Sequence, residues 1–245
     1  MVMNIEFKIS EEKYFNNGKI ILNSLPDIKN KIRMALSQKE VVKVTRRRPK
    51  GKPEYDGIDA ASLNDALRRC INKEPIKGET HVENGVFFHN TKEGFDFSAY
   101  DENYNMSRLY NYYQGATGVL DGDKKIIDLY KKMGCGKKEW KGKINAIQST
   151  VAYNSDHVVD KEILTVVGEL QFGNWALIYR DLFRLLDADS DPGIDLYIYV
   201  AADEYLSGLL SANTVSYKQA NDVINEYLSI IKTPIWLISL GINEL

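Results

Sequence analysis

The alternation of apolar and polar positions is clearest in the last third of the chain. Residues 163–175 read ILTVVGELQFGNW, an apolar, β-branched run that becomes polar at alternate positions, Glu169 and Gln171. Residues two apart in a strand lie on the same face of a sheet. The pattern therefore predicts a strand in which Glu169 and Gln171 look out together, while Leu170 and Phe172 point the other way into a core.

The remainder of this region alternates between helical and strand patterns. From Asp160 onward the sequence predicts the order strand, helix, strand, helix, helix, strand. The last helix is expected over residues 218–231 and the last strand over residues 234–242. Such an order is typical of an α/β fold with a mixed central β-sheet flanked by helices.

The first half of the chain carries weaker patterns. Residues 1–23 predict a short strand or extended segment and a loop, and helices are expected over residues 24–37 and 60–71. Between those helices, the Pro and Gly residues of 41–52 predict a loop. This loop is the most basic stretch of the protein and has no acid; its cations are Lys43, Arg46, Arg47, Arg48, Lys50 and Lys52.

Residues 74–137 are rich in Gly, Asn and Tyr and contain few long apolar runs. We interpret them as an insertion or subdomain, with a hairpin at Asn84–Gly85 and a short helix near residues 124–133. A chain of 245 residues with 44% hydrophobic residues is long enough to form a full core around such an insertion.

The overall composition excludes several classes of protein. The formal net charge of −2 does not indicate a nucleic-acid partner, and the two cysteines lack metal-ligand spacing and form no disulfide framework. No apolar run approaches the roughly 20 residues that span a bilayer, and the N-terminus lacks the pattern of a signal peptide. We therefore expect a cytoplasmic protein without a membrane partner, its thiols reduced.

A pair of acids accompanies the predicted strand. Asp160 stands nine residues before Glu169, at the start of the apolar run. Two carboxylates and a strand carbonyl suit a hard, octahedral cation such as Mg²⁺. Asp160 has an alternative as an ordinary turn residue, and Asp156 and Glu162 are near enough in sequence to replace it. Burying Glu169 without a cation would be costly, so it either faces water or serves a site.

The pattern Asp160…Glu169-Leu170-Gln171 resembles the active site of the PD-(D/E)xK nucleases, in the variant where Gln replaces Lys. The strand is followed by a short polar turn, a helix and a strand that reads Ile-Asp-Leu at 194–196. This order is similar to that of Type II restriction endonucleases of the BstYI, BglII and BamHI type.

The resemblance covers residues 150–245 well and the first 70 residues loosely. It implies a single restriction-endonuclease-like domain over residues 1–245, in which 150–245 carry the catalytic and dimerisation elements and 74–137 are inserted. It also implies a homodimer that binds double-stranded DNA and cleaves both strands of a short palindromic site, leaving 5′-phosphates. Close relatives recognise sites built around GATC.

By resemblance, the catalytic residues are Asp160, Glu169 and Gln171, and Mg²⁺ is bound by Asp160, Glu169 and the carbonyl of Leu170. A neutral amide is no useful general base, so Gln171 is expected to orient the attacking water. This departure from the usual Lys leaves the general base unassigned.

Three segments are candidates for DNA binding. Asn174 matches a base-contacting residue of the family and is equally suited to capping a helix that starts at Trp175. The turn of Ser211, Asn213 and Thr214 lies where relatives read the major groove, with an ordinary polar turn as its alternative. The basic loop of 41–52 suits phosphates or the minor groove, or is simply solvated.

Two rival functions remain open from the sequence. One is a repair or nicking nuclease of the same fold that acts as a monomer, which its size in solution would distinguish. The other is a catalytically inactive DNA-binding relative, which would retain DNA without cutting it in Mg²⁺.

Overall fold

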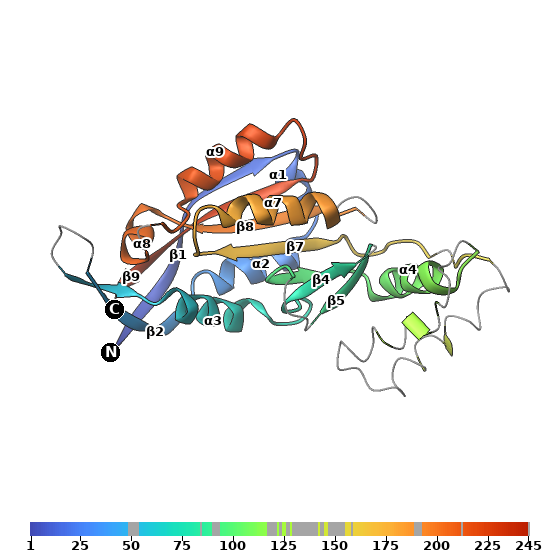
Figure 1. Cartoon of the computed structure of the whole chain (residues 1–245), viewed down its shortest axis with the longest axis horizontal. Coiled ribbons are helices and arrows are strands. Elements are labelled where there is room, and N and C mark those ends of the chain that lie inside the picture. The colour runs from blue at the N-terminus through green and yellow to red at the C-terminus, as the bar shows by residue number, and fades with distance from the viewer. Residues whose placement is uncertain are drawn as a thin grey trace.

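The computed structural model describes residues 1–48, 54–83, 85–89, 94–116, 155–157, 159–188, 193–211 and 213–244, with a few isolated residues between 122 and 146. Its centre is a seven-stranded sheet in the order β3-β2-β1-β9-β8-β7-β6 (Figure 1). These strands are β1 Val2–Phe15, β2 Lys39–Arg47, β3 Tyr55–Ile58, β6 Phe97–Ala99, β7 Val166–Gln171, β8 Leu196–Ala202 and β9 Ile235–Glu244.

The sheet is mixed. Strands β7, β8 and β9 are parallel neighbours, and all the other neighbouring pairs are antiparallel. The three parallel strands are buried on both faces, which explains their nearly continuous apolar sequences. A separate hairpin pairs β4 (Thr80–Glu83) with β5 (Val86–His89), and Gly85 turns it with φ 73°. This is the hairpin that the sequence predicts.

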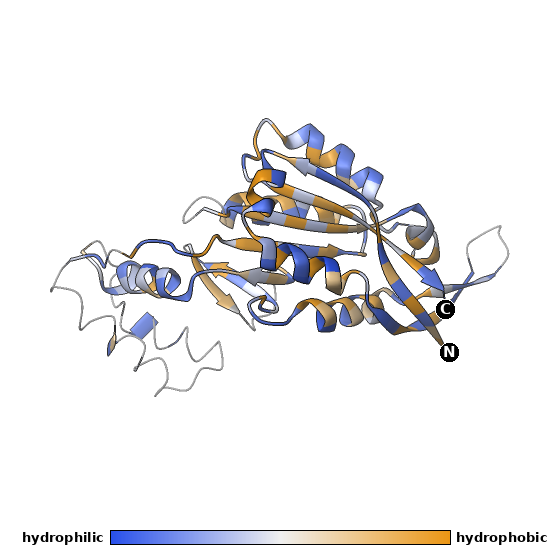
Figure 2. Cartoon of the chain, turned by 180° about the vertical axis from the view of Figure 1, so that it is seen from behind, coloured by the Kyte–Doolittle hydropathy of each residue, from blue (hydrophilic) through white to orange (hydrophobic). Residues whose placement is uncertain are grey.

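Helices cover both faces of the sheet. One face carries α1 (Gly18–Asn23), α2 (Pro26–Ala35), α3 (Ala60–Ile71) and α8 (Glu204–Leu209); the other carries α7 (Leu177–Ala188) and α9 (Tyr217–Tyr227). Each layer has its own apolar core, and the hydrophobic strands lie between helices whose outer sides are polar (Figure 2). The mixed α/β fold and the element order after Asp160 are therefore confirmed.

Two predictions for the first half need correction. The strand expected in residues 1–23 is long, because Ile5 and Phe7 alternate with polar residues and enter the core, and a helix stands in place of the expected loop. Most of the predicted basic loop of 41–52 is strand, since β2 pairs with β1 on one side and β3 on the other. Near the sheet edge such a strand tolerates exposed cations, which hide its strand pattern.

The bounds predicted for the insertion also differ from those in the structure. Within 74–137, strand β6 joins the main sheet beside β7, so this part belongs to the core. The long excursion runs from Ala99 to Val166 and begins with α4 (Glu102–Gln114), which lies beyond the end of the sheet (Figure 1). The helix expected near 124–133 falls almost wholly outside the described residues. No helix in the described part of the chain is long and apolar enough to cross a membrane.

Candidate active site

The short β6–β7 ladder places two acids face to face. Its register pairs Phe97 with Gly168 and Ala99 with Val166, and one further step brings Asp96 opposite Glu169. Gly168 is required here, because a Cβ at this position would overlap the ring of Phe97. The two carboxylates therefore come from segments that are far apart in the sequence and meet only in the sheet.

Asp96 is held at the point where the ladder ends. Its Oδ2 accepts a hydrogen bond of 2.7 Å from the backbone N–H of Leu170, and its Oδ1 forms an ion pair with Arg68 of α3. The N–H and C=O of one strand residue point to the same side of the strand. The carbonyl of Leu170 therefore faces the edge that Asp96 occupies, so the donors that can surround a cation are two carboxylates and one carbonyl.

Glu169 lies in an environment that resists its negative charge. It is 4% exposed, and Arg184 of α7 forms an ion pair with its Oε1. Burial raises the pKa of Glu169 well above the ordinary value, the charges of Asp96 and Asp181 raise it further, and Arg184 only partly opposes them. Burial and the two neighbouring carboxylates thus disfavour the charged form of Glu169, and a bound cation would favour it.

Gln171 follows on the same face and is also buried, so the two side chains do not look out as the sequence pattern predicts; α7 covers this face of β7. Its Nε2 donates to Oδ2 of Asp181 at 2.5 Å, and its Oε1 accepts from the N–H of Gly173 at 2.9 Å. Asp181 is fully buried on α7, and burial raises its pKa, opposed by Gln171 and by the nearby arginines.

Asp160 does not reach this site. It is exposed, and the chain just after it is attached to the opposite end of β6, where the N–H groups of Glu162 and Ile163 donate to Asp101 Oδ2 at 2.9 and 3.3 Å. Asp101 lies five positions beyond Asp96, about 16 Å along an extended strand. The structure thus places Asp96, and not Asp160, beside Glu169.

Neither of the two substitutes for Asp160 reaches Glu169. Asp156 accepts a hydrogen bond from the N–H of Ala116, just past the end of α4, and Glu162 is tied to Asp101. The nine-residue spacing does not bring Asp160 beside Glu169, because the strand that pairs with β7 is β6, more than sixty residues earlier in the chain. A signal for Asp96 does exist: an acid between Phe95 and Phe97 that leads directly into a short apolar strand.

The donors suit Mg²⁺. Asp96 and Glu169 are 8% and 4% exposed, and hard oxygen ligands of this kind bind Mg²⁺ while it retains several waters. Across the described residues, no group of three or more His, Cys, Asp and Glu side chains is arranged to hold a metal. A cation here would therefore depend on the carboxylate pair, the Leu170 carbonyl and water.

Backbone contacts join Asn174 to the turn of Ser211, Asn213 and Thr214, which is predicted to contact base edges. Asn174 forms an isolated bridge with Thr214, and the N–H of Trp175 donates to the carbonyl of Asn213 at 2.8 Å. Oδ1 of Asn174 accepts from the N–H of Ala176 at 2.9 Å, in a turn that precedes α7, so the helix begins two residues later than expected. The hydroxyls of Ser211 and Thr214 lie 2.9 Å apart; Ser211 and Asn213 are exposed, and Thr214 is buried.

The arginines of the basic stretch 41–52 differ in their exposure and in their partners. Arg46 and Arg48 are exposed and share one acid, Glu54, at 2.9 and 2.5 Å. Arg47 is tethered to the carbonyls of Ile58 and Leu209, at 2.8 and 3.4 Å, and so joins the β2–β3 hairpin to α8. Lys50 and Lys52 lie outside the described residues.

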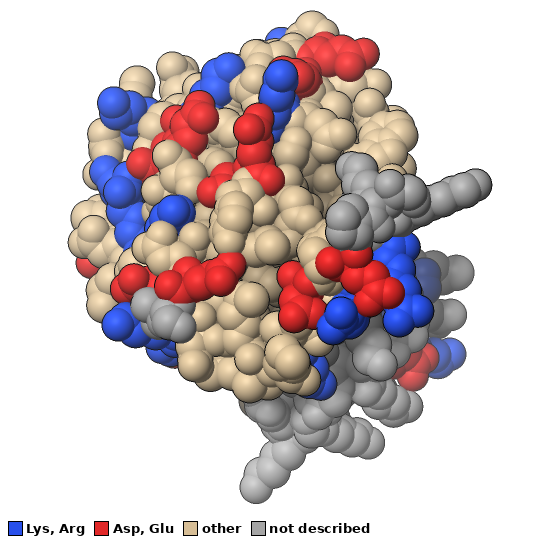
Figure 3. Space-filling view, turned by 90° about the vertical axis from the view of Figure 1, so that its left-hand side faces the viewer, with Lys and Arg blue, Asp and Glu red and all other residues tan. Residues whose placement is uncertain are grey.

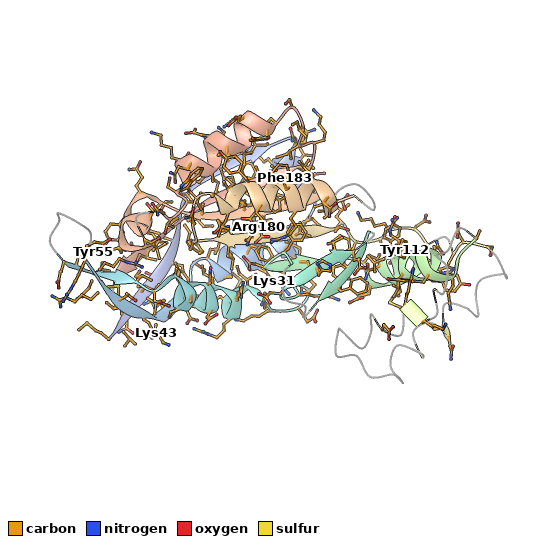
Figure 4. The ribbon with its side chains drawn as sticks, in the orientation of Figure 1. Lys31, Lys43, Tyr55, Tyr112, Arg180 and Phe183 are labelled. Atoms are coloured by element: carbon orange, nitrogen blue, oxygen red, sulfur yellow. The ribbon has the colours of Figure 1, made fainter. Side chains whose placement is uncertain are left out.

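The candidate DNA-contacting segments lie at one end of the molecule. The carboxyl ends of β7 and β8 point toward the β2–β3 hairpin, which Tyr55 marks in Figure 4. Viewed from this end, acidic and basic side chains are interspersed over the surface, with no continuous basic face among the described residues (Figure 3).

Comparison with known proteins identifies the family of the chain. A family model described as restriction endonuclease BglII/BglIII matches residues 10–240. The chain belongs to this family. It is therefore a restriction endonuclease of the BglII type, a nuclease that cleaves DNA at specific sequences.

Two solved structures resemble the chain. Restriction endonuclease BglII in complex with a DNA 16-mer is 13% identical, with a TM-score of 0.50, over 95% of this chain and 75% of that one. Free BglII is 12% identical, with a TM-score of 0.45, over 95% and 78% of the two chains. The first of these shows the shared fold. No curated protein sequence matches the chain.

Proposed function

We propose that this endonuclease is a Mg²⁺-dependent, cytoplasmic Type II enzyme that cleaves both strands of a short palindromic site built around GATC. The observation that carries the proposal is the pair Asp96 and Glu169, two buried carboxylates on adjacent strands beside the Leu170 carbonyl. They replace the pair Asp160 and Glu169 that the sequence spacing suggests.

The cation and the residues of the chain have separate roles in cleavage. Bound Mg²⁺ supplies neutralisation of charge at the scissile phosphate. Asp96, Glu169 and the Leu170 carbonyl would hold it, while Arg68 and Arg184 keep the two carboxylates in place. Gln171 orients the attacking water, which displaces the 3′ oxygen and leaves the phosphate on the 5′ end. The departing proton goes to solvent or to a phosphate oxygen, since an amide does not accept it.

A homodimer accounts for how one site per chain cuts two strands. The groove between α7 and α9 is apolar; Tyr179, Leu182, Phe183, Leu186, Tyr227 and Ile231 line it. Phe183 is 66% exposed and Ile230 58% exposed. Phe183 points toward α9, away from β7 (Figure 4). We propose this surface as the contact with a second copy, as the family resemblance implies.

The DNA-binding residues follow from their place at the carboxyl end of β7. Asn174 and the turn of Ser211, Asn213 and Thr214 are joined by backbone contacts and form one unit beside the site. We propose that this unit reads base edges, and that Arg46, Arg48, Lys50 and Lys52 contact phosphates. Arg47 serves to anchor the hairpin that carries them.

The experiment that tests this function is digestion of a sequenced plasmid with and without Mg²⁺, followed by mapping of the ends. Discrete, metal-dependent fragments with 5′-phosphates are expected. A smear would indicate a non-specific or repair nuclease, and intact DNA that is retarded on a gel would indicate an inactive binding relative. Sedimentation of the free protein tests the dimer, with Phe183→Asp expected to yield monomers.

The hairpin contacts make a separate prediction. Replacing both Arg46 and Arg48 with Gln should weaken binding to all DNA sequences and lower the slope of log affinity against log salt by about 2, because each phosphate contact contributes roughly 0.9. Filter binding over a range of salt in Ca²⁺ measures this. Arg108→Gln, on α4 at the other end of the molecule, is the control; an unchanged slope in the double variant would show that the hairpin lies away from DNA.

A further inference from the structure

Two neighbours, one a hydrogen-bond donor and the other an acceptor, determine the orientation of the side-chain amide of Gln171. The N–H of Gly173 can only donate, and it reaches Oε1 at 2.9 Å. The carboxylate of Asp181 accepts at Oδ2 from Nε2, 2.5 Å away. Turning the amide over would set donor against donor and acceptor against acceptor, so the two contacts select one orientation.

Asp181 is itself strongly held. It is fully buried, and its Oδ1 receives Arg180 at 3.1 Å and faces Arg184 at 3.8 Å. The hydroxyl of Tyr199 on β8 donates to Oδ2 at 3.4 Å. A buried carboxylate on a rigid helix, with partners on both oxygens, is a stable support for a second side chain.

Gly173 completes the support. A Cβ at this position would lie 3.0 Å from Oε1 of Gln171 and 2.9 Å from Cδ1 of Leu177. A side chain here would require Leu177 or the amide of Gln171 to shift, so glycine favours this close approach of the backbone N–H. Within the described residues, the second N–H of Gln171 Nε2 then has no protein partner.

We infer that Asp181 is a positioning residue for cleavage, which holds Gln171 so that its amide presents an N–H, and not its carbonyl oxygen, to the scissile phosphate or the attacking water. The donor contacts an oxygen atom and orients it; Asp181 touches neither substrate nor metal. This inference rests on the proposed function, because it assigns a role within that same site.

The principal test compares Asp181→Asn, Gln171→Ala and the double variant in Mg²⁺. Each single change should lower kcat about tenfold to a hundredfold, since loss of positioning has effects of that size. Because Asp181 acts through Gln171, the double variant should be no slower than Gln171→Ala alone. DNA affinity in Ca²⁺ and KM should stay within about twofold. Asp187→Asn, the same change at an exposed position of α7, is the matched control.

Additive losses in kcat would overturn the inference, as would an Asp181→Asn enzyme that cuts at the wild-type rate. A loss of DNA affinity equal to the loss of rate would point to a structural role. The same cycle is also measured without metal or DNA, as shifts in the denaturant midpoint of unfolding. The sum of the shifts in the two single variants should then exceed the shift in the double variant. Strict additivity would show that the contact between Gln171 and Asp181 is absent.

A reversed pair covers the case in which Asp181→Asn does not fold. Gln171→Glu alone sets two carboxylates against each other and should lower the unfolding midpoint, whereas Gln171→Glu with Asp181→Asn restores a donor–acceptor pair and should recover it. Cleavage should remain slow, because the N–H donor is gone; wild-type cleavage by the reversed pair would refute the donor role. If the wild-type protein cuts no DNA, the proposed function fails, while the unfolding measurements still decide whether Asp181 holds Gln171.

Discussion

The two ends of the β6–β7 ladder use acids in opposite ways. At one end, Asp96 and Glu169 face each other and pair with Arg68 and Arg184, yet burial and the neighbouring carboxylates raise the pKa of Glu169. At the other end, Asp101 accepts four backbone hydrogen bonds. Burial raises the pKa of Asp101, but those N–H groups outweigh it and the pKa is lowered. Asp101, satisfied by backbone N–H groups, holds structure, whereas the buried pair of Asp96 and Glu169 is the one whose charge a cation would stabilise.

The second end is an anchor for the insertion. Asp101 caps α4 through the N–H groups of Asn103 and Tyr104, at 2.9 and 3.0 Å, and also binds the N–H groups of Glu162 and Ile163 in the chain that returns to β7. One side chain thus closes the excursion that α4 begins. Figure 4 shows how far this end lies from the end proposed to contact DNA, with Tyr112 on α4 and Tyr55 on the hairpin at opposite extremes.

The largest expected effect is the loss of cleavage at the first end. Asp96→Asn or Glu169→Ala should lower the rate on the order of a thousandfold or more, because each removes a carboxylate that would hold the metal. Specific binding in Ca²⁺, measured by gel retardation, should persist in at least Asp96→Asn, which keeps the shape of the side chain. Full Mg²⁺-dependent activity in either variant would refute the site.

Arg184→Met should affect stability more than any other change to these contacts. It leaves Glu169 buried and unpaired, which should lower the free energy of unfolding by about 2 kcal/mol; the partial exposure of Arg184 keeps the cost below that of a fully buried pair. Denaturant unfolding measures this. Added Mg²⁺ should recover more stability in the variant than in the wild type, because a cation compensates the same charge. Equal gains of stability in the variant and the wild type would show that Arg184 does not interact with the metal site.

Asp101→Ala should cost somewhat less, about 1–2 kcal/mol, through loss of the cap and of the contacts to the returning chain. The pKa of Asp101 is lowered in the folded protein, so its contribution is complete above the unfolded pKa of about 3.9 and disappears as pH falls through the folded value. Unfolding measured from pH 6 downward should therefore show the wild type and the variant converging below pH 4. Divergence toward acid would contradict the shift.

The smallest effect is expected from Asp160→Asn. Asp160 is exposed, so the stability should change by less than about 0.5 kcal/mol and cleavage should remain. This variant is the natural comparison for Asp96→Asn, since both remove one acid and only one of them faces Glu169. If Asp160→Asn abolished cleavage and Asp96→Asn did not, Asp160 and not Asp96 would be the acid that acts with Glu169.

Local periodicity was sufficient for much of the fold. Helix α3 has the predicted bounds, the elements after Asp160 have the predicted order, and Glu169 and Gln171 share one face of β7 as predicted. Each of these follows from residues a few positions apart, whose spacing reports directly which side of an element is buried. The short range of the signal is also why β2, whose cations are exposed near a sheet edge, was predicted as a loop.

The partners of Glu169 and Gln171 were decided by the tertiary structure alone. Asp96 reaches Glu169 across an insertion that spans Ala99 to Val166, and Arg184 and Asp181 reach them from a helix in another layer. Pairing between distant strands leaves no fixed spacing in the chain, so a nine-residue interval could suggest Asp160 as the partner. The sequence by itself determined that an acid and an amide share one face of this strand; only the folded sheet decided which carboxylate stands opposite them.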